Sequence, residues 1–200
     1  MNKQLAKAIS ILFHPAIYPL IGLFFVFKYL PYHYSRDVVV LSMIMVFCGT
    51  YLIPVLISLI LYRFKVISSL MMDKAEDRTW PYAVGAICFF LSASLVKNAG
   101  LAPEAYRFLL GSAITILLHL PLLRYLKPSA HLAGFGGFLG LLLAVSAKYA
   151  INMLPFIALF LVIGGLIASA RLALKAHNGR ELIIGFLSGL VIIFGSVYMI

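Results

Sequence analysis

A polar stretch near the end of the chain, residues 170–181, holds an arginine, a histidine and a carboxylate. Arg171 is followed six residues later by His177, and Glu181 comes four residues after that histidine. If His177 and Glu181 both lie in the first turn of a helix, they share one face of it. A carboxylate beside a histidine fixes the tautomer of the ring and raises its basicity, which prepares the ring as a nucleophile or a general base.

An ordinary explanation of the same stretch stays open. The stretch lies between two hydrophobic runs, so it is also typical of a basic loop at a membrane face, with His177 as an interfacial residue. A motif match by itself is only a hypothesis. The elements that surround and position these residues therefore have to be considered.

The composition indicates which class of protein carries this stretch. Hydrophobic residues make up 64% of the 200 positions, charged residues make up 11%, and the mean hydropathy is +1.07. Soluble domains are about 45–50% apolar and about 25% charged. The sequence therefore predicts a polytopic membrane protein, organised as a single integral membrane domain over residues 1–200.

The charge balance and the cysteines indicate which kinds of molecule the protein is expected to bind. The net charge of +10 comes from 16 Lys and Arg residues against 6 Asp and Glu residues. In a membrane protein such an excess indicates loops that face the cytoplasm and anionic lipid. We predict the lipid bilayer as a partner and no nucleic acid, and the oligomeric state is left open. Cys48 and Cys88 lie inside apolar runs and read as packing residues, without disulfide or metal-ligand spacing.

Seven hydrophobic runs are candidates for spanning helices, each of which needs about 20 mostly apolar residues. Lys3 and Lys7 precede the first run as in a signal peptide, but no small-residue cleavage site follows, so we expect a spanning helix there. Only helices fit runs of this length, because the bilayer satisfies no backbone polar groups. We predict an all-α, polytopic transmembrane helical bundle with six to seven spanning helices. The runs lie roughly at residues 9–30 (kinked at His14-Pro15 and Pro19), 38–62 (containing Pro54), 81–96 (the weakest), 106–126, 131–151, 154–174 and 182–200.

Small residues recur at four-residue spacing in the last three runs. The pairs are Gly136 with Gly140, Gly165 with Ser169, and Gly185 with Gly189. Such spacing lets membrane helices approach closely. We therefore expect the last three helices to form a compact bundle around the loops that they carry.

Three polar segments interrupt the hydrophobic chain. They are residues 73–81, residues 127–131 and the stretch 170–181. In a chain that crosses the membrane seven times, all three emerge on the same face. This agreement predicts a single site built from the three segments.

Two of these segments resemble motifs of a known family. Pro128-Ser129-Ala130-His131 resembles the Pro-Ser-Gly-His motif of the type 2 phosphatidic acid phosphatase superfamily, with Ala130 in place of glycine. Arg171, His177 and Glu181 resemble its third motif, which is an Arg, five residues, a His, three residues and an Asp. The chain has Glu where the family motif has Asp.

The first family motif, a Lys followed by six residues and then Arg-Pro, is matched only in part. Lys74 and Arg78 are closer together than in the motif, and Pro81 lies three residues beyond the arginine. The resemblance covers roughly residues 74–189 and implies a phosphatase-like core at about residues 70–200. The chain is also similar to small bacterial membrane members of that superfamily, which carry an early His-Pro helix and an Ala-Arg-Leu…His ending.

The resemblance implies a metal-independent lipid phosphatase of the bacterial inner (cytoplasmic) membrane, without a cofactor. His177 would attack phosphorus and form a phosphohistidine, Glu181 would orient it, and His131 would be the general acid for the leaving oxygen. The substrate would carry a phosphate monoester or diphosphate head group, on a phospholipid or an isoprenoid lipid. The residues implied to bind the phosphate are Lys74, Arg78, Ser129 and Arg171.

The physical chemistry of these groups agrees with the implied roles. Guanidinium groups bind phosphate in a bidentate manner. Ser129 and the N–H groups at the start of the following helix are suited to an anion. Phosphoryl transfer depends mostly on positioned charge. The alternative hypothesis is a non-catalytic anionic-lipid binder or carrier that keeps a degenerate phosphatase fold, and the partial first motif favours it.

Other polar residues were given structural roles. His14 and His119 lie beside prolines inside apolar runs, where each could hydrogen-bond a carbonyl freed by a kink. His33, between two tyrosines, is typical of an interfacial aromatic belt. Asp73, Glu76 and Asp77 face no second acidic cluster, which disfavours a site for Mg²⁺.

The distribution of basic residues predicts the face on which the site lies. With seven crossings, Lys and Arg are more numerous on the face of the N-terminus and the three polar segments than on the opposite face. The positive-inside rule then places the predicted site at the cytoplasmic face. Bacterial members of the resembled family more usually work at the outer face of the inner membrane.

A reporter fused after residue 200 tests this orientation. We expect a reporter that is active only in the periplasm to give a signal there, because seven crossings put the C-terminus opposite the site. A silent periplasmic fusion beside a strong cytoplasmic reporter at the same position would contradict the prediction.

Overall fold

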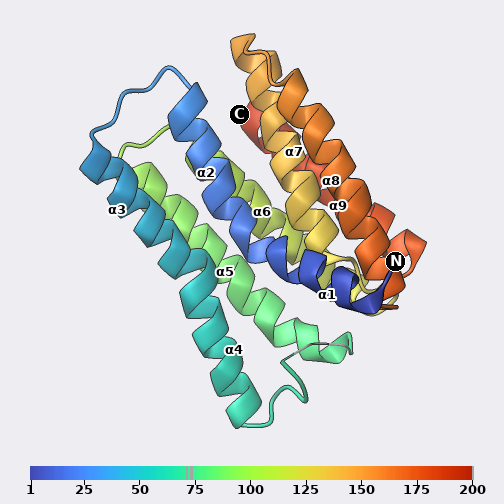
Figure 1. Ribbon diagram of the computed structural model, residues 1–200. Helices are drawn as coiled ribbons and strands as arrows, with labels where there is room; N and C mark the ends of the chain where they lie inside the picture. The colour runs from blue at the N-terminus through green and yellow to red at the C-terminus, as the bar shows by residue number, and fades with distance from the viewer. Residues whose placement is uncertain (71, 73, 200) are drawn as a thin grey trace. The chain divides into compact units, whose positions relative to one another are not determined.

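The computed structural model describes residues 1–70, 72 and 74–199 of the chain, and all regular elements in this part are helical (Figure 1). Seven helical stretches within it are long and apolar enough to cross a membrane. The prediction of an all-α integral membrane fold with six to seven spanning helices is therefore confirmed. The elements are α1 (Lys3–Leu12), η1 (Pro15–Ile17), α2 (Tyr18–Tyr29), α3 (Arg36–Phe47), η2 (Cys48–Leu52), α4 (Ile53–Arg63), α5 (Glu76–Asn98), α6 (Pro103–Leu122), α7 (Ala130–Tyr149), α8 (Leu154–Ala173) and α9 (Gly179–Tyr198).

The first hydrophobic run is interrupted at the predicted His14-Pro15 step. Helix α1 ends at Leu12, and the N–H of His14 bonds the carbonyl of Ile11 in a tight turn. Pro15 has no N–H to continue the α-helical pattern and begins the short 3₁₀ turn η1. Pro19 lies in the first turn of α2, where a helix needs no intrahelical N–H. Only the first of the two expected kink sites therefore breaks the helix.

Prolines and polar residues also shape the next two runs. Pro54 is preceded by a π-helical turn, η2, because the chain must pass a residue that offers no N–H and whose ring crowds the preceding turn. Helix α5 begins at Glu76, earlier than the expected start near Pro81. The sequence pattern missed this first turn because Asp77 and Arg78 are polar, yet acidic side chains favour a helix N-terminus.

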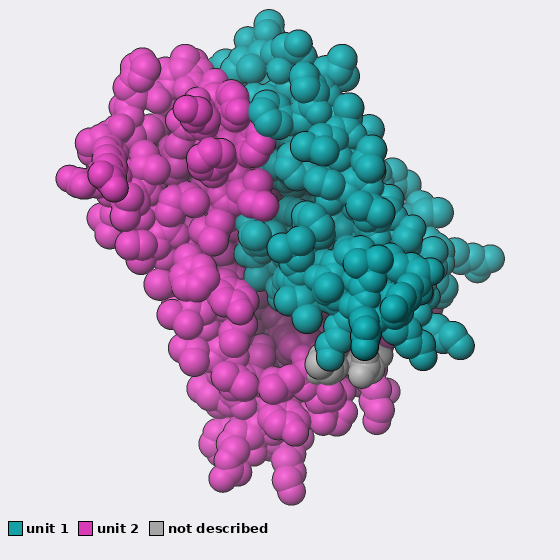
Figure 2. Space-filling model, viewed as in Figure 1, with its two compact units in different colours: residues 1–18, 128–200 teal, residues 19–127 magenta. Residues whose placement is uncertain are grey.

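The described chain divides into two compact units, which Figure 2 colours separately. Unit 1 contains residues 1–18 and 128–200, and unit 2 contains residues 19–127. Unit 2 is built on the contact of α5 with α6, and η2 and α4 pack on α5. The single membrane domain expected from the sequence stays a prediction.

Helix α7 is the core of unit 1. Most of its side chains are buried, and it packs against α9, α8 and η1, while α1 packs against α8. The backbones of α7 and α9 touch at their glycines, since a Cβ on Gly136 or Gly189 would overlap the carbonyl oxygen of Phe186 or Ala133. The expected close approach is therefore confirmed for α7 and α9.

The glycine pair expected to pack in α8 behaves differently. A Cβ on Gly165 would meet no atom within 4 Å, so the predicted Gly165–Ser169 packing face is wrong at this glycine. The preceding residue, Gly164, makes the close contact instead, against the ring of Phe135 on α7. A one-residue shift turns the packing face by about 100°, because a helix has about 3.6 residues per turn.

Candidate functional site

The unit 1 residues expected from the sequence to form a site lie at one end of its helices. Helices α7 and α9 begin at this end, α8 finishes there, and α1 lies beside it (Figure 1). Five residues expected from the sequence belong to this end: Ser129, His131, Arg171, His177 and Glu181. The following contacts tie them together.

The start of α9 is fixed by a capping box. The side chain of Asn178 accepts a hydrogen bond from the Glu181 N–H at 3.0 Å, and Glu181 Oε2 accepts one from the Asn178 N–H at 3.1 Å. His177 therefore lies just before the helix cap, not within the first turn as the sequence suggested. The expected contact still forms, because Nδ1 of His177 lies 3.1 Å from Glu181 Oε2.

This contact determines which ring nitrogen of His177 carries the lone pair when the ring is neutral. A carboxylate accepts, so Nδ1–H donates and the lone pair of the neutral ring lies on Nε2. The side chain of His177 is only 1% exposed and that of Glu181 is 13% exposed. Water therefore competes weakly for the pair, and the carboxylate holds the ring in one orientation.

The end of α8 turns the chain sharply from Arg171 toward His177. The N–H of Ala176 bonds the carbonyl of Arg171, and the N–H of Lys175 bonds that of Leu172. Lys175 takes a left-handed conformation, with φ of 54°. This pattern is a Schellman motif, which closes a helix and reverses the chain in a few residues.

The segment before α7 is attached directly to α9. The N–H of Ser129 donates to the backbone carbonyl of Glu181 at 3.0 Å, and the Ser129 hydroxyl caps α7 by accepting from the N–H of Leu132 at 3.4 Å. A Cβ on Gly185 would lie 2.6 Å from the carbonyl oxygen of Ser129. The absence of a side chain at Gly185 thus lets the two segments meet.

His131 contacts residues of the N-terminal helix. Its Nε2 lies 3.1 Å from the carbonyl oxygen of Ser10, and its ring meets that of His14 edge-on, with 5.7 Å between centroids. A carbonyl accepts, so Nε2 carries the proton and Nδ1 holds the lone pair of the neutral ring. His131 also lies close enough to Arg171 and His177 to interact with them electrostatically.

Arg171 reaches the same serine from α8. Its Nη1 donates to the Ser10 hydroxyl at 3.3 Å. Ser10 therefore lies between His131 and Arg171, and Ser10 itself is buried. No motif in the sequence points to Ser10; the one signal is its spacing of four residues from His14 in an apolar run, which would put both on one helix face.

His14 has a different role from the one expected. Its Nδ1 accepts from the N–H of Ala16 at 3.4 Å and so caps the turn η1. The expectation was that His14 would bond a carbonyl freed by the kink. The freed carbonyl is that of Ser10, and His131 contacts it.

The two residues of the partial first motif belong to unit 2. Arg78, in the first turn of α5, donates from Nε to the carbonyl of Met72 at 2.9 Å and from Nη1 to Tyr82 at 3.4 Å. The ring of His119 on α6 lies 6.5 Å from that of Tyr82. Lys74 is exposed in the segment before α5.

One acidic residue beside this motif, Asp77, ties the start of α5 to Ser68. Asp77 accepts from both the N–H and the hydroxyl of Ser68, each at 2.6 Å. Asp73 lies outside the described residues. Within the part of the chain that the structure describes, no three His, Cys, Asp or Glu side chains are grouped to hold a metal ion. The expected lack of a cofactor stays a prediction.

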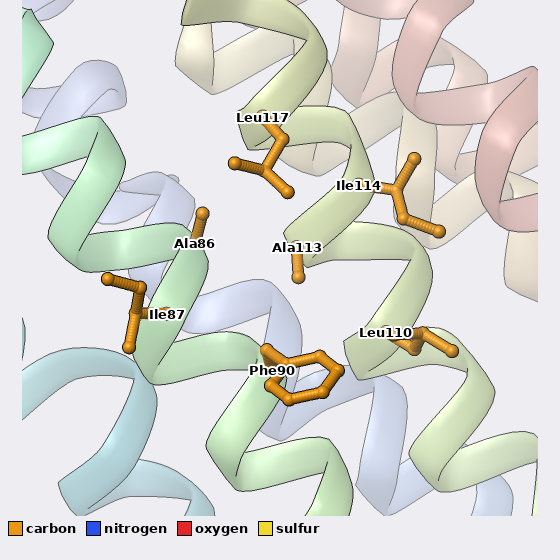
Figure 3. A pocket seen from close by; sticks show the side chains of 7 residues that line it. All are labelled: Ala86, Ile87, Phe90, Leu110, Ala113, Ile114 and Leu117. Carbon is orange, nitrogen blue, oxygen red and sulfur yellow. The ribbon is translucent and has the colours of Figure 1, made fainter.

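Unit 2 has a hollow of another kind. It lies between α5 and α6, and the seven side chains that line it are apolar (Figure 3). Phe90 and Leu110 are among them. A binding site normally needs a few polar groups to orient its ligand. The polar end of unit 1 is therefore the candidate site.

Comparisons with protein-family models, with curated proteins and with solved structures find no match to this chain. The resemblance to the phosphatase superfamily thus rests on the spacing of the motifs. In chemical terms, the site combines one histidine held by a carboxylate, one held by a backbone carbonyl, and a guanidinium. Such a set can bind an anion and move a proton or a phosphoryl group.

Replacement of Gly185 by alanine tests the attachment of α7 to α9. We expect Gly185→Ala to lower the thermal unfolding temperature in detergent, because the new Cβ meets backbone and overpacking costs about 1–3 kcal/mol. The matched control is Gly195→Ala on the same helix, where a Cβ would meet no atom within 4 Å. Equal unfolding temperatures for the two variants would contradict the close contact.

Proposed function

We propose that the protein is an integral membrane phosphatase that releases phosphate from the monoester or diphosphate head group of a lipid. The observation that carries the proposal is the contact of 3.1 Å between Nδ1 of His177 and the Glu181 carboxylate. It orients a buried imidazole so that the lone pair of its neutral ring lies on Nε2, the nitrogen proposed to attack phosphorus. Arg171 and His131 belong to the same end of unit 1 and can bind the phosphate and move the proton.

The first step would transfer the phosphoryl group to His177. Nε2 attacks phosphorus, the bond from phosphorus to the leaving oxygen breaks, and its electron pair stays on that oxygen. Nε2 of His131 is bonded to the carbonyl of Ser10. The nitrogen that gives its proton to the leaving oxygen is therefore Nδ1 of the protonated ring.

The second step would release phosphate. Water attacks the phosphohistidine, neutral His131 takes a proton from that water at Nδ1, and the bond from phosphorus to Nε2 breaks with its electron pair returning to His177. Glu181 stabilises positive charge on the His177 ring throughout both steps. Arg171 would hold the phosphate oxygens, because guanidinium is always charged and donates in a planar fork.

A further phosphate ligand is proposed from the resemblance, Ser129 with the N–H groups at the start of α7. Lys74 and Arg78, which the resemblance also implies, belong to unit 2, and their part in phosphate binding stays a prediction from the sequence. Ser129 adds a helix N-terminus, where the N–H groups and the helix dipole favour an anion. A lipid substrate suits an integral membrane protein, and the bacterial inner membrane is the proposed location.

One observation favours a second candidate, a non-catalytic binder of anionic lipid. His131 and Arg171 are both engaged with Ser10, and the side chain of His177 is almost fully buried. Polar residues that satisfy one another in this way also stabilise a membrane fold. Catalysis distinguishes the two candidates, since a binder releases no phosphate.

The deciding measurement is phosphate release by the purified protein in detergent, with His177→Ala as the variant. We expect the wild type to be active with EDTA present and inhibited by vanadate, and His177→Ala to lose about a thousandfold or more in kcat. His33→Ala is the matched control, because His33 is exposed and outside the site. An inactive wild type would support the binder, and an active, folded His177→Ala protein would remove His177 as the nucleophile.

A second variant, Glu181→Gln, tests the carboxylate. Glutamine keeps the capping box, so the unfolding temperature should stay near that of the wild type. We expect kcat to fall by about 10–100-fold, less than in His177→Ala, because an amide accepts a hydrogen bond but does not stabilise imidazolium charge. Wild-type kcat in Glu181→Gln would mean that the carboxylate only caps α9.

A further inference from the structure

The N-terminal helix α1 reaches the candidate site through one residue, Ser10. Its carbonyl oxygen lies 3.1 Å from Nε2 of His131, and its hydroxyl accepts from Nη1 of Arg171 at 3.3 Å. Ser10 and Ala6, one turn apart, are the buried residues of α1. One residue therefore contacts both the proposed proton donor and the proposed phosphate-binding arginine.

The carbonyl of Ser10 has no hydrogen-bond partner within α1, because this helix ends at Leu12. In a continuous helix the N–H of His14 would bond the carbonyl of Ser10, four residues before it. Here that N–H bonds Ile11 instead, and the chain turns at Pro15. The carbonyl of Ser10 thus has no helical partner, and His131 supplies one from α7.

We propose that Ser10 is a positioning residue for phosphoryl transfer, which orients His131 through its carbonyl and Arg171 through its hydroxyl. The proposal rests on the proposed phosphatase function. The contact of Glu181 with His177 is similar, because in both cases an oxygen accepts from one ring N–H and fixes the orientation of the ring.

The two orienting oxygens differ in charge, which suits the two histidines to different tasks. A carboxylate carries a full negative charge and stabilises an imidazolium, as the nucleophile needs while it bears the phosphoryl group. A backbone carbonyl carries only a partial charge. It orients the ring of His131 but leaves the ring able to release its proton to the leaving oxygen.

The hydroxyl is tested by kinetics in the full-length protein. We expect Ser10→Ala to lower kcat/KM about tenfold, because a hydrogen bond to a charged group that fixes its direction is lost. Ser10→Thr, which keeps the hydroxyl, should recover most of the loss. Ser94→Ala should behave as the wild type, because the Ser94 hydroxyl bonds only its own helix, at the Phe90 carbonyl, and is exposed.

The carbonyl is tested by ¹⁵N NMR of histidine-labelled full-length protein in detergent, with His131→Ala to assign the signals. At a pH where the His131 ring is neutral, we expect a single tautomer with the proton on Nε2 and not on Nδ1. Pro15→Ala restores an N–H to the turn, so that α1 can continue and His14 can take the Ser10 carbonyl. We expect His131 in Pro15→Ala to show both tautomers, and the pH profile of kcat to shift.

The outcomes separate this role from the proposed function. A wild type that releases no phosphate overturns the function and this role together. An active wild type with Ser10→Ala as active as Ser94→Ala overturns the role of the hydroxyl alone. A mixed tautomer of His131 in the wild type overturns the role of the carbonyl. A Ser10→Ala loss that Ser10→Thr does not recover means that Ser10 only packs α1 against the bundle.

Discussion

Direct backbone contact between α7 and α9 is the constraint on which the polar end of unit 1 depends. Glycines at 136, 140, 185 and 189 remove the side chains that would hold the helices apart. Membrane helices associate through such close packing, because lipid provides no hydrophobic drive between them. The same contact joins the N–H of Ser129 to the carbonyl of Glu181 and thereby brings two sequence motifs together. The close packing of α7 and α9 and the contact between these two motifs therefore depend on the same pair of helices.

Much of the fold was predictable, because each spanning helix is a local pattern. A bilayer leaves backbone groups no partner but their own helix, so length and hydropathy identify the spans. The use of hydropathy to find the spans also explains why the start of α5 was missed. Asp77 and Arg78 lie within the helix, but they are polar and lower the local hydropathy. The packing face of α8 was predicted wrongly at Gly165. A repeat of small residues gives their spacing along a helix, but it does not say which side of the helix faces its neighbour.

The candidate site was predictable only where its residues are near in sequence or share a motif. His177 and Glu181 are four residues apart, and the capping box makes their contact a local property of the chain. The contacts of Ser10 span 121 residues to His131 and 161 residues to Arg171. No spacing within one helix predicts such contacts. The sequence holds only an indirect sign of them, which is a proline that follows α1 and leaves the Ser10 carbonyl without a helical partner.

Each ring of His131 and His177 is held by an oxygen of the protein, and this contact affects both the stability of the fold and the orientation of the ring. A buried polar group in a membrane protein is costly unless a partner satisfies it. Each ring gives one nitrogen to an oxygen of the protein, which satisfies the fold and fixes the ring. The second nitrogen of each ring then has a defined direction. An imidazole is the side chain suited to this division, because its neutral ring has one donor and one acceptor nitrogen, and the partner of one fixes the role of the other.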